Sequence, residues 1–204
     1  MATILLDGWQ GSHHRLEHLR RVLDGVIWPY ENSGRTSIVR LATELASHLR
    51  CLDRPFHAVG YSMGGLVIRE ALRQQPDLPL RRAVFLHTPH QGTLAAHLLP
   101  GAALREMRPD SDFLRCLNAA PWTVPTLNVW CPGDLVVIPG WNARWPQAAQ
   151  EFPTRLPAHV WPLFDPALPL RIAKFLTEQD AQDQTHPDPA GATQAAGSGT
   201  AAAC

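Results

Sequence analysis

Gly60-Tyr61-Ser62-Met63-Gly64-Gly65 is the stretch that decides the fold, because it places a serine between two glycines. The apolar, β-prone run Phe56–Val59 comes before it, and Leu66–Leu72 follows with apolar residues at helical spacing. Strand, sharp turn and helix are the context in which a G-x-S-x-G pattern exposes a nucleophilic serine. Crowding in such a turn requires neighbours without side chains. The pattern predicts a reactive Ser62; the alternative is a glycine-rich connection with an incidental serine.

Length and composition limit the classes of protein to which this chain can belong. Its 204 residues and 45% hydrophobic content predict one domain with a buried core. With 18 basic and 18 acidic residues, charge balance indicates no nucleic-acid partner. Without a visible signal peptide or a membrane-length apolar run, we expect no stable membrane insertion and a cytoplasmic location, unless a leader was removed. A monomer is expected.

The scattered cysteines predict free thiols: Cys51, Cys116, Cys131 and Cys204.

Alternating hydrophobic patterns along the chain predict an α/β fold with a mostly parallel sheet of about six strands. Strands are expected at residues 2–6, 26–28, 56–59, 83–86 and 126–130, with a weaker sixth at 151–156. Helical spacing occurs at residues 16–26, 38–49, 66–72 and 170–176. Strands that alternate with flanking helices are typical of a sheet that is covered on both faces.

Three ranges divide the predicted organisation of the chain. Residues 1–176 form the folded domain. Residues 89–125 carry helical pieces without a clear strand and are the region from which a small cap over the site would come. Residues 177–204 contain no large apolar side chain, so they are predicted to form a low-complexity, disordered tail.

A nucleophilic serine needs a histidine base, and that histidine needs a carboxylate to orient it. In this architecture the chain order is serine, acid, histidine, each after a later strand. Asp134 follows the predicted strand at 126–130 and is the expected acid, although an aspartate also caps Pro-Gly turns. Asp165 is the reserve, but it comes after His159 and breaks the order.

Two histidines remain after Asp134 in the chain, and their positions decide between them. His186 lies in the low-complexity tail, where nothing would fix an imidazole. His159 lies in a loop between the last predicted strand and the final helix, so it is the predicted base. A solvated loop histidine is the alternative for His159.

The oxyanion of an acyl-transfer reaction needs two donors. The N–H of Met63, directly after the serine, is the first expected donor. The second is assigned to the N–H of Trp9, because Gly8 lets that loop approach closely. Gly8 could instead only relax a tight loop.

Further histidines and tryptophans are weaker candidates for the site. His14 and His18 have a zinc-compatible spacing, but no third ligand is evident, so no metal or cofactor is predicted. His87 and His90 precede the acid and are expected to shape the site rather than transfer protons. Two tryptophans, Trp9 and Trp161, flank the expected active-site loops and could line an acyl pocket, or simply pack in the core.

Four segments carry a resemblance to a known family: Ile4–Gly8, Gly60–Gly65, Thr88–Thr93 and Gly133–Val137. Through them, residues 2–176 resemble a small serine lipase or esterase of the α/β-hydrolase superfamily, and compact bacterial triacylglycerol lipases most of all. Two positions depart from the family pattern. Asp7-Gly8 stands where His-Gly is usual, which bears on the second oxyanion donor, and His87 stands where glycine is usual.

The resemblance implies a minimal α/β-hydrolase fold and hydrolysis of carboxylic esters through an acyl-enzyme. Uncharged, aromatic-rich loops predict a small-molecule ester with an apolar, short-to-medium acyl group and little interfacial activation. The fold does not determine the acceptor, so acyl transfer or thioester hydrolysis on the same three residues is the first alternative. A hydrolase-fold binding module that has lost catalysis is the second.

Overall fold

A central sheet of six parallel strands organises the computed structural model, which describes residues 1–52, 54–154 and 158–178. The strands are β1 (Ala2–Leu6), β2 (Gly25–Ile27), β3 (Phe56–Tyr61), β4 (Leu80–Leu86), β5 (Thr126–Trp130) and β6 (Gln150–Pro153). Across the sheet they run in the order β2-β1-β3-β4-β5-β6, and each neighbouring pair is parallel. The predicted α/β fold with about six strands is confirmed.

Strand boundaries differ from the predicted ones where pairing extends or ends a strand. β4 begins earlier than expected, because Leu80 already pairs with Phe56 of β3. β6 is shorter than the predicted 151–156, and its last pair joins Pro153 to Trp130. Residues 155–157 lie outside the described part of the chain. β5 has the bounds that the apolar run predicts.

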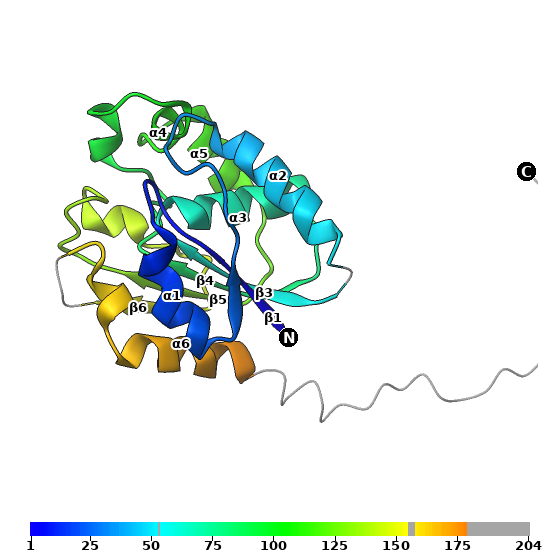
Figure 1. Ribbon diagram of the computed structural model, residues 1–204. Coiled ribbons are helices and arrows are strands. Elements are labelled where there is room, and N and C mark those ends of the chain that lie inside the picture. The colour runs from blue at the N-terminus through cyan, green and yellow to red at the C-terminus, as the bar shows by residue number, and fades with distance from the viewer. Residues whose placement is uncertain (53, 155–157, 179–204) are drawn as a thin grey trace, which may run out of the picture.

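Helices cover both faces of the sheet. The four long ones are α1 (His13–Val22), α2 (Ile38–Arg50), α3 (Met63–Gln74) and α6 (Ala167–Thr177). Figure 1 shows α2 and α3 on one face and α1 and α6 on the other. Strand β1 serves both layers, because alternate side chains of a strand point to opposite faces: Ile4 and Leu6 pack with α2 and α3, whereas Leu5 packs with α1 and α6.

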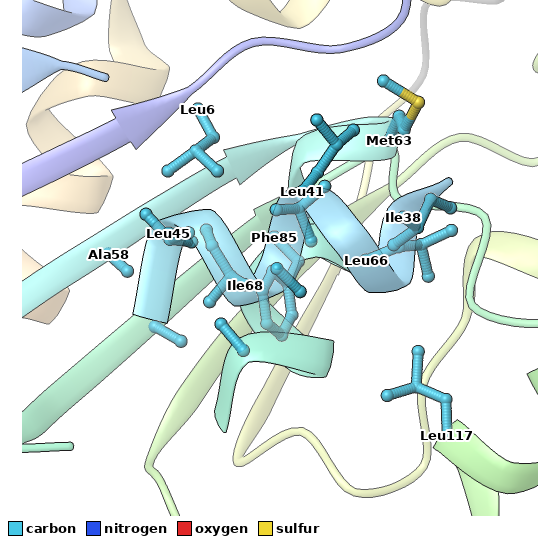
Figure 2. Close-up of a cluster of buried hydrophobic side chains, with 14 of the residues drawn as sticks. Leu6, Ile38, Leu41, Leu45, Ala58, Met63, Leu66, Ile68, Phe85 and Leu117 are labelled. Carbon is cyan, nitrogen blue, oxygen red and sulfur yellow. The ribbon is translucent and has the colours of Figure 1, made fainter. Parts of the chain in front are cut away.

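The larger core lies between the sheet and the α2–α3 layer (Figure 2). Ser37 is the N-cap residue of α2, and its Oγ accepts the N–H of Arg40 and so satisfies one free donor of the first turn. Ile38, Leu41 and Leu45 recur on one face of this helix and are fully buried. Each such side chain stabilises the fold by about 1.5–3 kcal/mol relative to exposure.

The segment after β4 is helical and contains no strand in its described residues, as predicted. Its elements are η1 (Leu94–His97), α4 (Ala102–Glu106) and α5 (Asp112–Ala119). In Figure 1 α4 and α5 lie beyond one end of the sheet, next to α2 and α3. Two further short turns complete the fold, η2 (Gly140–Ala143) and η3 (Trp161–Phe164). The division into domain, cap and tail stays a prediction.

Residues 179–204, which make up nearly all of the predicted disordered tail, lie outside the described residues. This range includes His186 and Cys204. Of the described cysteines, Cys51 and Cys116 are exposed and Cys131 is buried. In the part of the chain that the structure describes, no helix has the length and apolar character needed to span a membrane.

Candidate active site

The turn between β3 and α3 holds Ser62 in a rarely populated backbone conformation. Its φ is 53° and its ψ is −121°, and its N–H donates to the carbonyl of Leu86 at 2.8 Å. A non-glycine residue persists in such a conformation only when its surroundings enforce it, and these conformations cluster at functional sites. A Cβ at Gly64 would lie 2.6 Å from the carbonyl oxygens of Leu6 and Asp7. The glycine in the predicted motif is therefore a steric requirement of this turn.

Ser62, His159 and Asp134 form one continuous chain of hydrogen bonds. His159 Nε2 lies 3.0 Å from Ser62 Oγ, and His159 Nδ1 lies 2.7 Å from Asp134 Oδ2. With the proton on Nδ1, His159 donates to the carboxylate and its Nε2 accepts from the serine hydroxyl. All three side chains are buried. The structure thus brings together the three side chains that the sequence places after β3, after β5 and in the loop before α6.

Hydrogen bonds hold both oxygens of the Asp134 carboxylate. Oδ1 accepts the N–H groups of Val136 at 2.8 Å and Val137 at 2.9 Å, and Oδ2 accepts from His159 and, at 2.9 Å, from His87 Nδ1. Burial opposes ionisation of this carboxyl, but the hydrogen bonds from the two histidines outweigh it, and the pKa of Asp134 lies well below its usual range. Asp134 is therefore a fixed carboxylate at neutral pH.

Asp165, the reserve candidate for the acid, makes a different contact. Its Oδ1 accepts the N–H of Ala167 at 2.9 Å, at the start of α6, which makes it a local helix-start residue. The structure brings Asp134, not Asp165, to His159.

Sequence reasoning missed the contact between His87 and Asp134. His87 follows β4, is fully buried, and has a φ of 51°. That left-handed backbone conformation is uncommon for a residue other than glycine. The pKa of His87 is lowered because burial disfavours its charged form. The one signal available in the sequence was a histidine where the family pattern has glycine.

His90 lies apart from this cluster, contrary to the expectation that it shapes the site. Its ring stacks on Trp145 with centroids 4.9 Å apart, and its Nδ1 lies 3.0 Å from a guanidinium nitrogen of Arg69. Its Nε2 lies 3.2 Å from Asn128 Oδ1. Burial among these groups holds the pKa of His90 well below its ordinary value. His90 is a neutral part of the core.

The loop after β1 packs directly against Ser62. A Cβ at Gly8 would lie only 2.7 Å from Ser62 Cβ. Asp7 holds the loop, since its Oδ1 accepts the Gly8 N–H at 2.7 Å and its carbonyl accepts the hydroxyl of Tyr30. The Trp9 indole N–H donates to the Ser33 carbonyl at 2.8 Å. Asp7, which replaces the usual histidine, therefore stabilises the loop that carries the expected second oxyanion donor.

A cavity of about 450 Å³ opens beside Ser62. Most of its wall is apolar. The segment after β4 supplies Ala96, Leu99, Leu104 and Met107, and the loop after β5 supplies Leu135, Val136 and Val137. Trp9 lines the cavity, which is one of the two roles considered for it from the sequence, whereas the side chain of Trp161 lies outside the described part of the structure. Such a cavity suits an apolar group bound next to the serine hydroxyl.

Histidines and carboxylates that could bind a metal ion occur in two places among the described residues. His14 and His18 are exposed on α1. Among the described residues the one group whose ligand atoms lie close enough, all within 4.8 Å, consists of His87, Asp134 and His159. Those atoms are already paired with one another through hydrogen bonds. The cluster is accounted for without an ion.

The chain has the α/β-hydrolase fold, with Ser62 at the strained turn between β3 and α3. No protein-family model matches the sequence, and no curated protein matches it. Solved structures do match.

Aspergillus fumigatus lipase B is 16% identical, with a TM-score of 0.68 over 85% of this chain and 51% of the lipase. The mature Bacillus licheniformis lipase BlEst2 is 16% identical, with a TM-score of 0.65 over 82% of this chain and 91% of the lipase. The type II thioesterase YbtT of the yersiniabactin pathway is 19% identical, with a TM-score of 0.56 over 87% and 90%.

The chain spans about half of the Aspergillus lipase, and 37% and 38% of two matched phospholipase structures. At these identities the likeness shows the fold alone, and the reaction must be argued from the site.

Proposed function

We propose that this protein is a serine hydrolase that cleaves carboxylic esters through an acyl-enzyme. One observation carries the proposal: a serine at a strained strand-to-helix turn shares a hydrogen-bond chain with an imidazole and a buried carboxylate. These are the roles that nucleophilic acyl transfer needs, namely nucleophile, base and orienting group.

In the proposed acylation, Ser62 Oγ attacks the ester carbonyl carbon while His159 Nε2 takes the hydroxyl proton. The carbonyl π electrons move to oxygen and form a tetrahedral oxyanion. When the oxyanion collapses, the bond to the alcohol oxygen breaks and His159 returns its proton to that oxygen. Asp134 remains ionised, fixes the Nδ1–H tautomer and stabilises the transient imidazolium.

Deacylation repeats these steps with water as the nucleophile. His159 takes a proton from water, the resulting hydroxyl attacks the acyl carbon, and the Ser62 oxygen leaves with the returned proton. The products are a carboxylic acid and a regenerated serine.

The proposed oxyanion donors are the backbone N–H groups of Met63 and Trp9. Met63 is the first residue of α3, and the first N–H groups of a helix have no acceptor within it. The helix dipole also favours negative charge there. The close approach of Gly8 to Ser62 supports Trp9 as a donor, because it brings the loop that carries the Trp9 N–H next to the serine.

The apolar cavity is proposed to bind the acyl group of the substrate. Its wall from Leu99, Leu104 and Met107 offers no hydrogen-bonding partner to a charged or strongly polar chain. A short-to-medium acyl group is the proposed substrate class. Rates with p-nitrophenyl butyrate and octanoate should exceed the rate with palmitate. A sharp rate increase as a triglyceride passes its solubility limit would contradict the proposed lack of interfacial activation.

The test of the reaction is turnover of p-nitrophenyl butyrate by Ser62→Ala, with Ser47→Ala as control. Ser47 is exposed on α2, where its hydroxyl donates to the Thr43 carbonyl. We expect a loss in kcat of about 10⁴-fold or more for Ser62→Ala and none for the control. Undiminished turnover by Ser62→Ala would refute the assignment.

Two parallel measurements separate the alternatives. A matched pair of acyl ester and acyl thioester distinguishes an esterase from a thioesterase, and addition of an alcohol acceptor detects acyl transfer. A fluorophosphonate probe should label Ser62, because it traps only an activated serine. Absence of labelling, together with absence of turnover, would indicate a non-catalytic module of this fold.

A further inference from the structure

Two imidazoles, not one, donate to the same oxygen of Asp134. His159 Nδ1 lies 2.7 Å and His87 Nδ1 lies 2.9 Å from Oδ2. The two rings meet edge to face, with centroids 5.5 Å apart and an interplanar angle of 63°. A hydrogen bond to an ionised acceptor is among the stronger ones in proteins, and two donors must share the charge of one oxygen here.

The backbone fixes His87 rigidly. Its N–H donates to the carbonyl of Val129 in β5 at 2.8 Å, so the residue is tied to the sheet on the strand next to its own. The side chain is fully buried and does not line the cavity beside Ser62. His87 therefore contacts the acid but has no route to an ester bound in that cavity.

His87 is a neutral donor rather than a second base. Its Nε2 is buried without a hydrogen-bond partner among the described residues. A proton on Nε2 would leave a buried N–H donor without an acceptor in the neutral ring, and in the charged ring it would add a desolvated charge. The proton of the neutral ring must then sit on Nδ1, where Asp134 accepts it.

We propose that His87 is a positioning residue: it holds the Asp134 carboxylate from the sheet and withdraws part of its charge from His159. The inference rests on the proposed function, because it assigns His159 as the base. Asp134 then keeps its orientation while His159 alternates between neutral and charged forms. A carboxylate that is shared between two donors also stabilises the His159 imidazolium less strongly than one that is not shared.

Other charged and titratable groups act on the same cluster. The centroid of the Tyr61 ring lies 5.2 Å from that of the His159 ring. The Arg15 guanidinium carbon lies 5.9 Å from the Tyr61 ring centroid, and Arg15 Nε lies 3.7 Å from Asp7 Oδ2. Burial raises the pKa of Tyr61 so that it stays uncharged. Arg15 and Asp7 have opposite charges, and neither changes when His87 is replaced, so variants at this position isolate its effect.

The test compares variants that remove the Nδ1–H donor with one that keeps a donor. His87→Leu removes it and fills the space. His87→Gly removes it and relieves the left-handed backbone. His87→Asn places an amide N–H where Nδ1 was and tolerates a positive φ. For each variant kcat and KM for p-nitrophenyl butyrate are measured across pH, and Tm is recorded.

In His87→Leu and His87→Gly we expect the midpoint of the kcat/KM profile to rise by about 0.5–1 pH unit. We expect kcat to fall about 10-fold with little change in KM, because the acid loses one charge-assisted hydrogen bond but the cavity is untouched. His87→Asn should return the midpoint toward the wild-type value.

The proposal would be overturned if His87→Leu or His87→Gly folds but leaves the midpoint of the kcat/KM profile unchanged. It would also be overturned if His87→Asn shows the same shift as the variants that lack a donor. A purely structural role predicts lower Tm without any movement of the midpoint. Failure of the proposed function gives a different result, namely no Ser62-dependent turnover in the wild-type protein at any pH.

Discussion

Asp134→Asn is the substitution whose consequences follow most directly from the site. Its carboxylate accepts four hydrogen bonds, two on each oxygen, from Val136, Val137, His87 and His159. Asparagine keeps the shape but turns one acceptor into an NH₂ donor. In either orientation, the NH₂ group of the amide faces N–H donors that the carboxylate oxygen accepted.

If the NH₂ replaces Oδ2, it faces the Nδ1–H groups of both His159 and His87. The conflict with His159 is relieved only when the His159 proton moves to Nε2, the nitrogen that lies 3.0 Å from Ser62 Oγ. That tautomer cannot accept the serine proton. If the NH₂ replaces Oδ1, the buried N–H groups of Val136 and Val137 lose their acceptor instead.

The expected loss in kcat is about 10³–10⁴-fold, the range associated with a wrongly protonated base. Buried donors left without acceptors should lower the free energy of unfolding by about 1–3 kcal/mol. For a chain of this length that corresponds to about 2–4 °C in Tm for each kcal/mol. The variant should therefore fold and still be nearly inactive.

Hydrolysis of p-nitrophenyl butyrate gives kcat, and thermal unfolding gives Tm. Asp165→Asn is the matched control, because its amide oxygen can still accept the Ala167 N–H and it has no bond to His159. Asp134→Asn with near wild-type kcat, or an inactive Asp165→Asn, would refute the assignment of the acid.

Three further predictions follow from single contacts. Gly8→Ala puts a Cβ 2.7 Å from Ser62 Cβ and should cut kcat about 100-fold while the protein stays folded; unchanged kcat would show that the loop does not approach the serine. Leu104→Trp narrows the cavity and should shift preference toward shorter p-nitrophenyl esters; an unchanged chain-length profile would place the acyl group elsewhere. The pKa of Asp134 is lowered in the folded state, so its ionised form adds to the free energy of unfolding above about pH 4, and this contribution is lost as the pH falls below that value. On acidification, the free energy of unfolding of Asp134→Asn should therefore decrease less steeply than that of the wild-type protein.

The serine motif and the order of residues along the chain made much of the site predictable. In a parallel sheet the carboxyl ends of the strands meet at one edge, so Ser62 after β3 and Asp134 after β5 had to approach each other. Elimination then selected His159, because His186 lies in the low-complexity tail. Residue type and order carried enough information for these three positions.

Side-chain direction was the part that could not be predicted. His87 and His90 both precede Asp134 and were expected to have the same role, yet His87 reaches Asp134 whereas His90 stacks on Trp145 in the core. The difference depends on the φ of 51° at His87, which redirects the chain directly after β4. No propensity or hydrophobic period encodes such a local backbone conformation at a non-glycine residue.

The central claim is that Ser62 carries the acyl group during turnover. Its most direct test is mass spectrometry of protein quenched in acid within the first turnovers of p-nitrophenyl butyrate. We predict a burst of nitrophenol and a mass increase of one butyryl group on the peptide that contains Ser62, both absent in Ser62→Ala. Turnover that proceeds without any acylated Ser62 peptide, and at equal rate in Ser62→Ala, would contradict it.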